Sequence, residues 1–182
     1  LYAPEEKHVN NRWLTLALYR RCRLRGVEIR SREPAVGLDY SASGTLARVH
    51  TPQRTYGPSR VVVAAGARSS DLPGLRPRDR LPIRPVKGQA LSIRPDPASD
   101  PRRIVRSPDV YCVPHHPERL LVGASMEEVG FEPGNTAGEI LELLEYATDL
   151  LPQLRGRALT ETWWGYRPAA PDSLPVIGPS AR

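Results

Sequence analysis

Residues 61–66, "VVVAAG", separate two kinds of predicted sheet in this chain. A continuous β-branched run that ends in small residues and glycine is typical of a strand buried on both faces, as in a parallel sheet. The terminal glycine would let a ligand approach the backbone, and ligands of open α/β sheets bind just beyond such strand ends. We therefore expect this stretch to belong to a ligand-binding α/β domain.

The chain before this hexapeptide predicts one helix and several short strands. An asparagine cap, an apolar periodicity and Gly26 as a stop signal predict a helix over residues 10–25. Residues 26–29 are expected to form a short strand. Residues 33–56 predict strands joined by a turn at residues 43–44.

The chain after the hexapeptide has a different character. Residues 71–84 are rich in proline and arginine and indicate a boundary, after which alternating strands are expected at 86–93, 110–113 and 120–124. Thr136 and Glu139 have the spacing of a reciprocal capping box. This box predicts a helix that runs through Leu150 and ends at Pro152. A last strand at 158–166 and a loop at 168–178 complete a mixed α/β pattern, part parallel and part antiparallel.

Composition narrows the class of protein. No apolar run approaches the roughly 18 residues of a membrane helix. The formal charge of +6 comes almost entirely from arginines, spread over the first two thirds of the 182 residues, so it does not predict a nucleic-acid-binding stripe. Cys22 and Cys112 lie far apart and form no disulfide or zinc motif, which favours a reducing cytoplasm.

Two residues stand out as candidate ligand contacts. Arg167, between aromatic residues and a proline-rich turn, could hold a carboxylate through two parallel hydrogen bonds, although an arginine stacked on tryptophan is the alternative. Tyr111, on a predicted strand, could donate to the same anion or serve only packing. The adjacent His115 and His116 would point to opposite faces of an extended chain, so no metal site is predicted. No nucleophile triad, acid–base pair or G-x-G-x-x-G fingerprint is present.

Four segments in order carry a family resemblance: "VVVAAGARSS", "RPVKGQALSI", the run from "VYCVPHH" to "LLPQL", and "WWGYRPAAPDSLPVIG". Together they resemble the second half of a FAD-dependent oxidase of the D-amino-acid oxidase class, most like the glycine oxidases of thiamine biosynthesis. The resemblance implies part of a Rossmann-like FAD-binding domain over residues 1–74. It further implies an antiparallel-sheet substrate domain over 75–166 and the return to the FAD-binding domain over 167–182.

The resemblance also implies roles for particular residues. Substrate would be bound by Arg167 as carboxylate anchor, by Tyr111 as its helper and by Met126 as part of the pocket wall. The cofactor FAD would be contacted by Val36, Ala64, Ala65 and Gly66. No side-chain acid or base is expected, because in this class the flavin accepts a hydride from the substrate Cα and the protein supplies orientation and electrostatics.

The activity implied is oxidative deamination of glycine, sarcosine or a similar small amine. The imine formed is hydrolysed to glyoxylate and ammonia, and dioxygen is reduced to hydrogen peroxide. Because the N-terminal glycine fingerprint and a C-terminal flavin segment are missing, we expect a fragment of a cytoplasmic enzyme of thiamine biosynthesis. A quinone-coupled D-amino-acid dehydrogenase and a truncated non-catalytic module are alternatives. The amine preferred and a homo-oligomeric state stay open.

Overall fold

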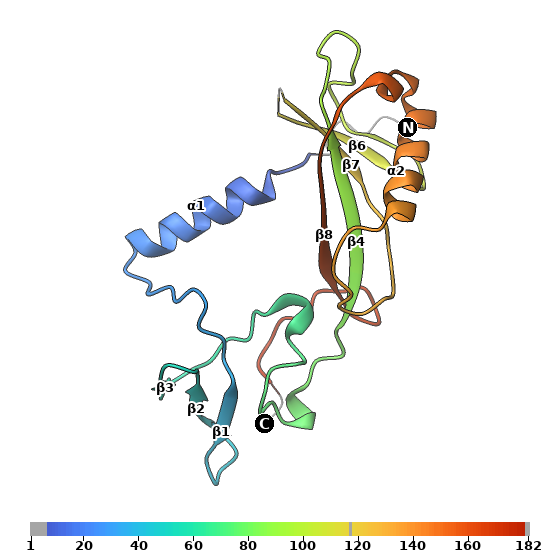
Figure 1. The fold of residues 1–182 in the computed structure, drawn as a ribbon. Helices are drawn as coiled ribbons and strands as arrows, with labels where there is room; N and C mark the ends of the chain where they lie inside the picture. The colour runs from blue at the N-terminus through green and yellow to red at the C-terminus, as the bar shows by residue number, and fades with distance from the viewer. Residues whose placement is uncertain (1–6, 117, 181–182) are drawn as a thin grey trace. The chain divides into compact units, whose positions relative to one another are not determined.

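The structure is a computed structural model that describes residues 7–116 and 118–180 (Figure 1). The described residues divide into two compact units, one up to Pro34 and one from Ala35 onward. None of the described helices is both long and apolar enough to cross a membrane.

The first unit contains the helix α1 (Asn11–Leu24), as its sequence predicts. The side chain of Asn10 caps it by accepting the N–H of Trp13 at 3.0 Å, and Gly26 follows it with a φ of +76°. Such a positive φ favours glycine at the end of a helix. Residues 26–29 were expected to be a strand but form none, and no strand of the described residues pairs with them to complete a ladder.

The second unit opens with a small antiparallel sheet in the order β1-β2-β3, formed by β1 (Gly37–Tyr40), β2 (Leu46–His50) and β3 (Thr55–Tyr56). The turn predicted at residues 43–44 joins β1 to β2, with Gly44 at a φ of +81°. His50 ties the three strands together. One ring nitrogen lies 2.7 Å from Asp39 Oδ2 and the other 2.9 Å from Thr55 Oγ1.

Residues 61–66 are not a strand in the structure. They lead into the short 3-10 helix η1 (Gly66–Arg68), and the side chain of Val62 is 87% exposed. A strand of a parallel sheet needs a neighbouring strand for its hydrogen bonds, and all strand pairs among the described residues are antiparallel. The expectation that residues 61–66 form a strand buried on both faces is therefore wrong: these residues are exposed, and no strand of the described residues pairs with them.

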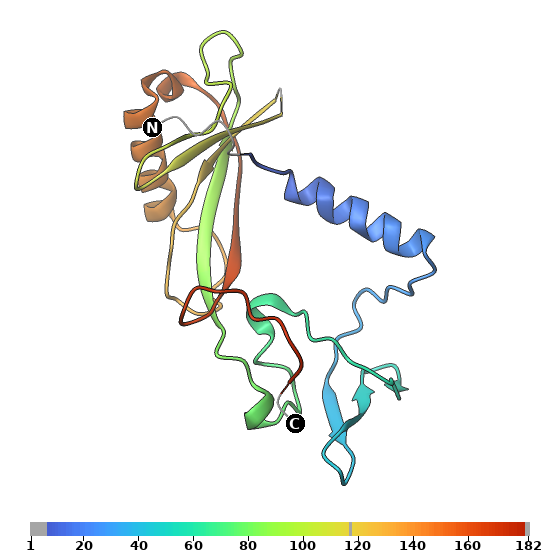
Figure 2. The same ribbon diagram turned by 180° about the vertical axis from the view of Figure 1, so that it is seen from behind.

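A five-stranded antiparallel sheet in the order β5-β6-β7-β4-β8 dominates the second unit (Figure 1). After the 3-10 helix η2 (Pro77–Asp79), β4 pairs along its whole length with β8 and along its second half with β7. Figures 1 and 2 show β4 and β8 side by side as the longest strands. The strands of this sheet are β4 (Arg84–Ile93), β5 (Val105–Arg106), β6 (Tyr111–His116), β7 (Arg119–Gly123) and β8 (Leu159–Ala169).

The helix α2 (Ala137–Leu150), followed by the 3-10 helix η3 (Pro152–Gly156), packs on one face of this sheet. Between them lies the buried core, made by Leu91, Ile93, Val110, Cys112, Leu120, Val122, Leu143, Ala147 and Leu154. The predicted boundaries of this helix are confirmed. The strand β8 ends at Ala169, three residues beyond its predicted end at residue 166, because β4 supplies pairing partners up to Ala169.

The capping box of α2 forms in one direction only. Thr136 Oγ1 accepts the N–H of Glu139 at 3.4 Å, as predicted. The reciprocal bond is replaced, because the N–H of Thr136 donates to Gln89 Oε1 of β4 at 2.8 Å. The helix terminus is thus fastened to the sheet rather than to its own first turn.

Candidate functional site

The strand β4 separates two chemical environments. Its odd-numbered residues, such as Leu91 and Ile93, face α2 and the core. Its even-numbered residues Gly88 and Ala90 face the other way, since successive side chains of a strand alternate between faces. Directly opposite residues of antiparallel strands share a face. The register therefore identifies which side chains of the neighbouring strands accompany Gly88 and Ala90.

One row of this second face crosses four strands: Tyr111 of β6, Gly123 of β7, Ala90 of β4 and Trp163 of β8. The ring of Tyr111 lies over Gly123, because a Cβ at position 123 would be 2.6 Å from the tyrosine hydroxyl oxygen. The side chain of Tyr111 is 41% exposed. Its hydroxyl is therefore presented on the open face of the sheet.

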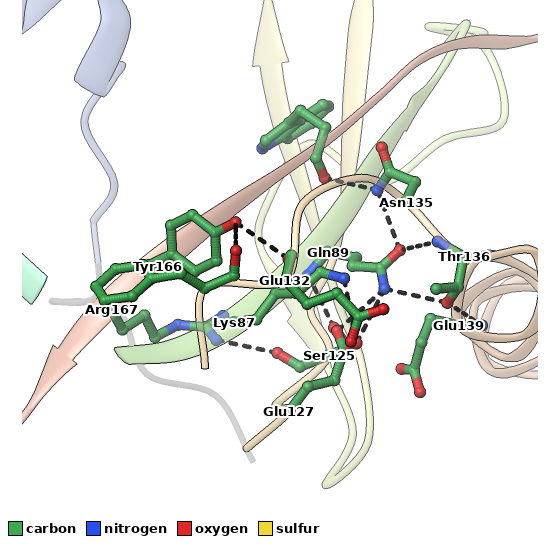
Figure 3. A network of polar contacts seen from close by, with 12 residues as sticks. Lys87, Gln89, Ser125, Glu127, Glu132, Asn135, Thr136, Glu139, Tyr166 and Arg167 are labelled. Carbon is green, nitrogen blue, oxygen red and sulfur yellow. Dashed lines mark hydrogen bonds and ion pairs between the residues drawn. The ribbon is translucent and has the colours of Figure 1, made fainter. Parts of the chain in front are cut away.

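Arg167 lies on the same face, at the end of β8. It is paired with Val86, but its guanidinium lies against Gly88, where a Cβ would be 2.4 Å from Nη1. The Nη1 group donates to the carbonyl oxygen of Ser125 at 3.0 Å (Figure 3). One N–H of the guanidinium is thereby used, and the exposed side chain has further donors for a ligand.

The pairing register brings the two polar groups to neighbouring positions on this face. Gly123 pairs with Ala90, so Gly123 and Gly88 are diagonal neighbours on adjacent strands. Diagonal neighbours are separated by about 7–8 Å. Charge-assisted hydrogen bonds of about 2.7–2.9 Å on either side of a carboxylate match that separation. The sheet thus places Arg167 and Tyr111 where a carboxylate could accept from both.

Met126 belongs to the same group of residues. The segment after β7 runs beside β4, with Lys87 and Glu127 joined by a bridge and the N–H of Ser125 donating to the carbonyl of Gln89. Met126 therefore lies alongside Gly88 on the Arg167 face, and its side chain is 77% exposed. Arg167 and Tyr111 thus share one face of the sheet, and Met126 lies beside that face in the segment that follows β7.

The aromatic surroundings expected for Arg167 are only partly present. Trp163 shares its face, with Gly165 between them, and a Cβ at Gly165 would meet nothing within 4 Å. Tyr166 points to the opposite face, where its hydroxyl contacts the carbonyl oxygens of Phe131 and Glu132, both at 3.0 Å. Adjacent residues of a strand cannot both flank the same side. The surface beside Arg167 is therefore formed by Gly165, and aromatic rings do not enclose it.

Beneath this face lies a buried polar cluster (Figure 3). Lys87, 1% exposed, has its Nζ 3.7 Å from Glu127 Oε2. Gln89, fully buried, donates from Nε2 to both oxygens of Glu127 at 3.1 Å and accepts from the Asn135 side chain at 3.2 Å. Burial, with Glu127 nearby, also raises the pKa of Glu139. The cluster connects the Ser125 segment with the start of α2.

The residues expected to contact FAD lie elsewhere in the second unit. Val36 precedes β1, where its N–H donates to the carbonyl of His50 at 2.7 Å. Ala64, Ala65 and Gly66 are exposed, and Gly66 has a φ of +57° with nothing within 4 Å of a Cβ built on it. Small, uncovered backbone of this kind fits a flat ligand lying against it.

The turn at Gly66 is joined to the Arg167 end of the sheet. The η1 helix contacts both β4 and β8. The guanidinium of Arg68 lies 3.9 Å above the ring of Phe131, and that ring meets Tyr166 edge to face at a centroid distance of 5.1 Å. Arg68, two residues after Gly66, is thus linked through the ring of Phe131 to Tyr166, the neighbour of Arg167 in β8. Among the described residues, no comparable series of contacts connects Val36 with the Arg167 end of the sheet.

Other parts of the described chain offer weaker candidates. A cavity of about 490 Å³ is lined by His115, Asp100, Arg119 and several prolines, but it contains neither Arg167 nor Tyr111. The side chain of His116 lies outside the described residues. Among those that are described, no group of three histidine, cysteine, aspartate or glutamate side chains is placed to hold a metal ion.

Sequence reasoning missed Gly88, Gly123 and Ser125. The two glycines interrupt strands, and a glycine inside a strand signals a close approach of another group. That signal was available in "VKGQ" and "LVGAS". The role of Ser125 depends on its backbone carbonyl, which carries no signature in the sequence.

Comparison with known proteins identifies the family. The model of the FAD-dependent oxidoreductase (DAO) family matches residues 1–182. The chain belongs to this family. It is 36% identical over 181 residues to the bifunctional protein ThiO/ThiG of Nostoc sp., covering 97% of this chain and 26% of that protein. It is 34% identical over 137 residues to a glycine oxidase of Pseudomonas putida, covering 75% of this chain and 37% of that enzyme.

The fold of this family member agrees with a solved relative. The crystal structure of glycine oxidase from Geobacillus kaustophilus matches with a TM-score of 0.82 at 29% identity, covering 91% of this chain and 44% of that one. The antiparallel sheet with its mixed α/β surroundings is thus the DAO-type fold predicted. The chain spans less than half the length of these relatives.

Proposed function

We propose that the protein to which this chain belongs oxidatively deaminates glycine or a similarly small amino acid. The observation that carries the proposal is the placement of the Arg167 guanidinium and the Tyr111 hydroxyl over Gly88 and Gly123 on one open face. A small carboxylate fits between them. Relatives named glycine oxidase and ThiO/ThiG support the reaction class, and we further propose that it serves thiamine biosynthesis in the cytoplasm.

The roles of the residues follow from their geometry. Arg167 would hold the carboxylate through the N–H groups that Ser125 leaves available, and Tyr111 would donate to the same group. Met126, alongside Gly88, would limit the apolar side of the pocket. The open space over Gly165 lies on the same face and would accommodate the small remainder of the substrate. Orientation of this kind is the protein's main contribution in cofactor enzymes.

The family's cofactor is FAD, which when bound supplies the electron acceptor for oxidation of the amine. Val36, Ala64, Ala65 and Gly66 would hold part of it through uncovered backbone and small side chains. We further propose that residues 1–74 and 167–182 belong to the FAD-binding domain and residues 75–166 to the substrate domain. The contact of Arg68 with Phe131 would join the two regions.

The decisive experiment uses the full-length gene product, purified and supplied with FAD. We expect hydrogen peroxide to be released with glycine or sarcosine and oxygen to be consumed in step. Reduction of a dye without oxygen consumption would instead indicate a dehydrogenase. A colourless protein that turns over no small amino acid would support a non-catalytic module and overturn the proposal.

A further inference from the structure

We propose that Ser125 and Glu127 are positioning residues for Arg167. In this scheme the Ser125 hydroxyl, held by Glu127, fixes the carbonyl oxygen that orients the guanidinium toward its ligand. The inference rests on the proposed function of Arg167 as a carboxylate anchor. It adds two residues whose proposed role is to act through Arg167.

Ser125 is held at each of its polar atoms (Figure 3). Its N–H donates to the Gln89 carbonyl at 3.1 Å, and its Oγ accepts the Gln89 N–H at 2.8 Å. The same hydroxyl donates its proton to Glu127 Oε1. Together with the backbone bonds between Glu127 and Lys87, these contacts restrict the Ser125 carbonyl oxygen, which accepts from Arg167 Nη1 at 3.0 Å.

Glu127 is in turn held by buried partners. Its side chain is 12% exposed and lies beside the ammonium of Lys87, which is 1% exposed, at 3.7 Å. The amide of Gln89 donates to both carboxylate oxygens. A partly buried carboxylate is tolerated only when it has partners, and here Lys87 and Gln89 supply them. It is therefore a firm acceptor for the Ser125 hydroxyl.

This chain of contacts matters because Arg167 is long and exposed. A free arginine side chain samples many rotamers, and ordering it when a ligand binds weakens affinity. The Ser125 carbonyl on one side and Gly88 beneath restrict the guanidinium before any ligand arrives. Loosening the carbonyl should thus weaken ground-state binding and leave the chemical step largely intact.

The test compares variants of the FAD-loaded full-length protein. Ser125→Ala removes the hydroxyl and Ser125→Thr retains it. Ser92→Ala removes a buried hydroxyl of β4, which contacts Thr160 Oγ1 at 2.7 Å. The readouts are KM and kcat for glycine, and the dissociation constant for acetate followed through the absorption of the bound flavin. We expect Ser125→Ala to raise KM and that constant by about three- to tenfold, the effect of one lost hydrogen bond, with kcat within twofold. Ser125→Thr and Ser92→Ala should resemble the wild type.

A second pair of variants guards against a folding defect in Ser125→Ala. Glu127→Asp keeps the charge beside Lys87 but withdraws it from Ser125, and Glu128→Asp makes the same change at the adjacent exposed glutamate. Only Glu127→Asp should weaken acetate binding. In an Arg167→Lys background, neither Ser125→Ala nor Glu127→Asp should weaken it further.

The outcomes separate this proposal from the one on which it rests. If Arg167→Lys weakens acetate binding but Ser125→Ala and Glu127→Asp do not, positioning is overturned and the anchor stands. An equal effect of Ser92→Ala would also overturn positioning. If Arg167→Lys leaves acetate binding unchanged, the anchor itself fails and both proposals fall.

Discussion

The guanidinium of Arg167 rests directly on Gly88 of the neighbouring strand. A Cβ at position 88 would lie 2.4 Å from Nη1 and 2.7 Å from Cζ, closer than real atoms approach. The pairing register sets Arg167 opposite Val86, so the side chain leans two residues along β4 to reach this place. The location of the positive charge therefore depends on the absence of a side chain on another strand.

Replacing Gly88 by alanine should displace Arg167. We expect Gly88→Ala to raise KM for a small amino acid by about tenfold or more, since at least one charge-assisted hydrogen bond to the carboxylate is lost. Steady-state kinetics of the full-length enzyme measure this. Gly138→Ala is the control, because a Cβ there meets nothing within 4 Å and Gly138 lies in α2, outside the proposed substrate site. Equal effects of the two substitutions would contradict this explanation.

Replacing Arg167 by lysine should separate charge from geometry. A lysine keeps the charge but loses the planar fork that binds both carboxylate oxygens. We expect KM to rise by about 10- to 100-fold, the equivalent of one or two such hydrogen bonds. An unchanged KM would assign Arg167 to a structural role only.

The buried pair of Lys87 and Glu127 should respond strongly to the loss of one member. Lys87→Met leaves the Glu127 carboxylate without its counter-charge, and we expect the free energy of unfolding to fall by about 3–5 kcal/mol. The double variant Lys87→Met/Glu127→Gln should recover most of that loss, as urea denaturation can show. Arg84→Met, which breaks the exposed pair with Glu128, is the control and should change stability far less. A double variant no more stable than Lys87→Met would argue against a charge effect.

The thiol of Cys112 should be unreactive in the folded protein. Burial, and secondarily the negative charge of Asp100, raise its pKa from 9.0 to about 11. Iodoacetamide at pH 9 should therefore modify Cys112 in urea but not under native conditions, as peptide mass mapping would reveal. The unfolded chain releases this proton at lower pH than the folded one. The free energy of unfolding should consequently decrease as the pH rises from about 9 to about 11. Rapid native alkylation would contradict the buried position.

The elements with their own local signals were predictable from the sequence. The helix after Thr136 and the strand containing Leu91 carry a capping residue and an apolar alternation, and both lie where expected. Residues 61–66 show the limit of this reasoning. Their composition describes a strand interior, yet a strand forms only where other chain supplies hydrogen-bond partners. Composition reports what a segment can bury, and pairing depends on the rest of the fold.

The sequence predicted the side chains of the candidate site, but not the residues that position them. Arg167 and Tyr111 were recognisable because their chemistry suits a carboxylate. Both side chains lie on one face because of the pairing register across four strands. The sequence of a single strand does not determine this register. Likewise, the N–H of Thr136 donates to the buried side-chain amide of Gln89 in β4 and not to Glu139, the partner that the capping box predicts. The sequence around Thr136 does not indicate this partner, because it comes from a distant strand.

Alternation along β8 also makes this site sensitive to changes of chain length. On one face, the hydroxyl of Tyr166 contacts the loop at Phe131 and Glu132. On the other face, Arg167 donates to the Ser125 carbonyl oxygen. Deleting one residue within this strand would exchange the two faces for everything beyond it. The ring of Tyr166 would then be carried to the open side and the guanidinium toward the buried cluster at Lys87. Natural length variation in this protein is thus expected in the loops on either side of β8 and not within it.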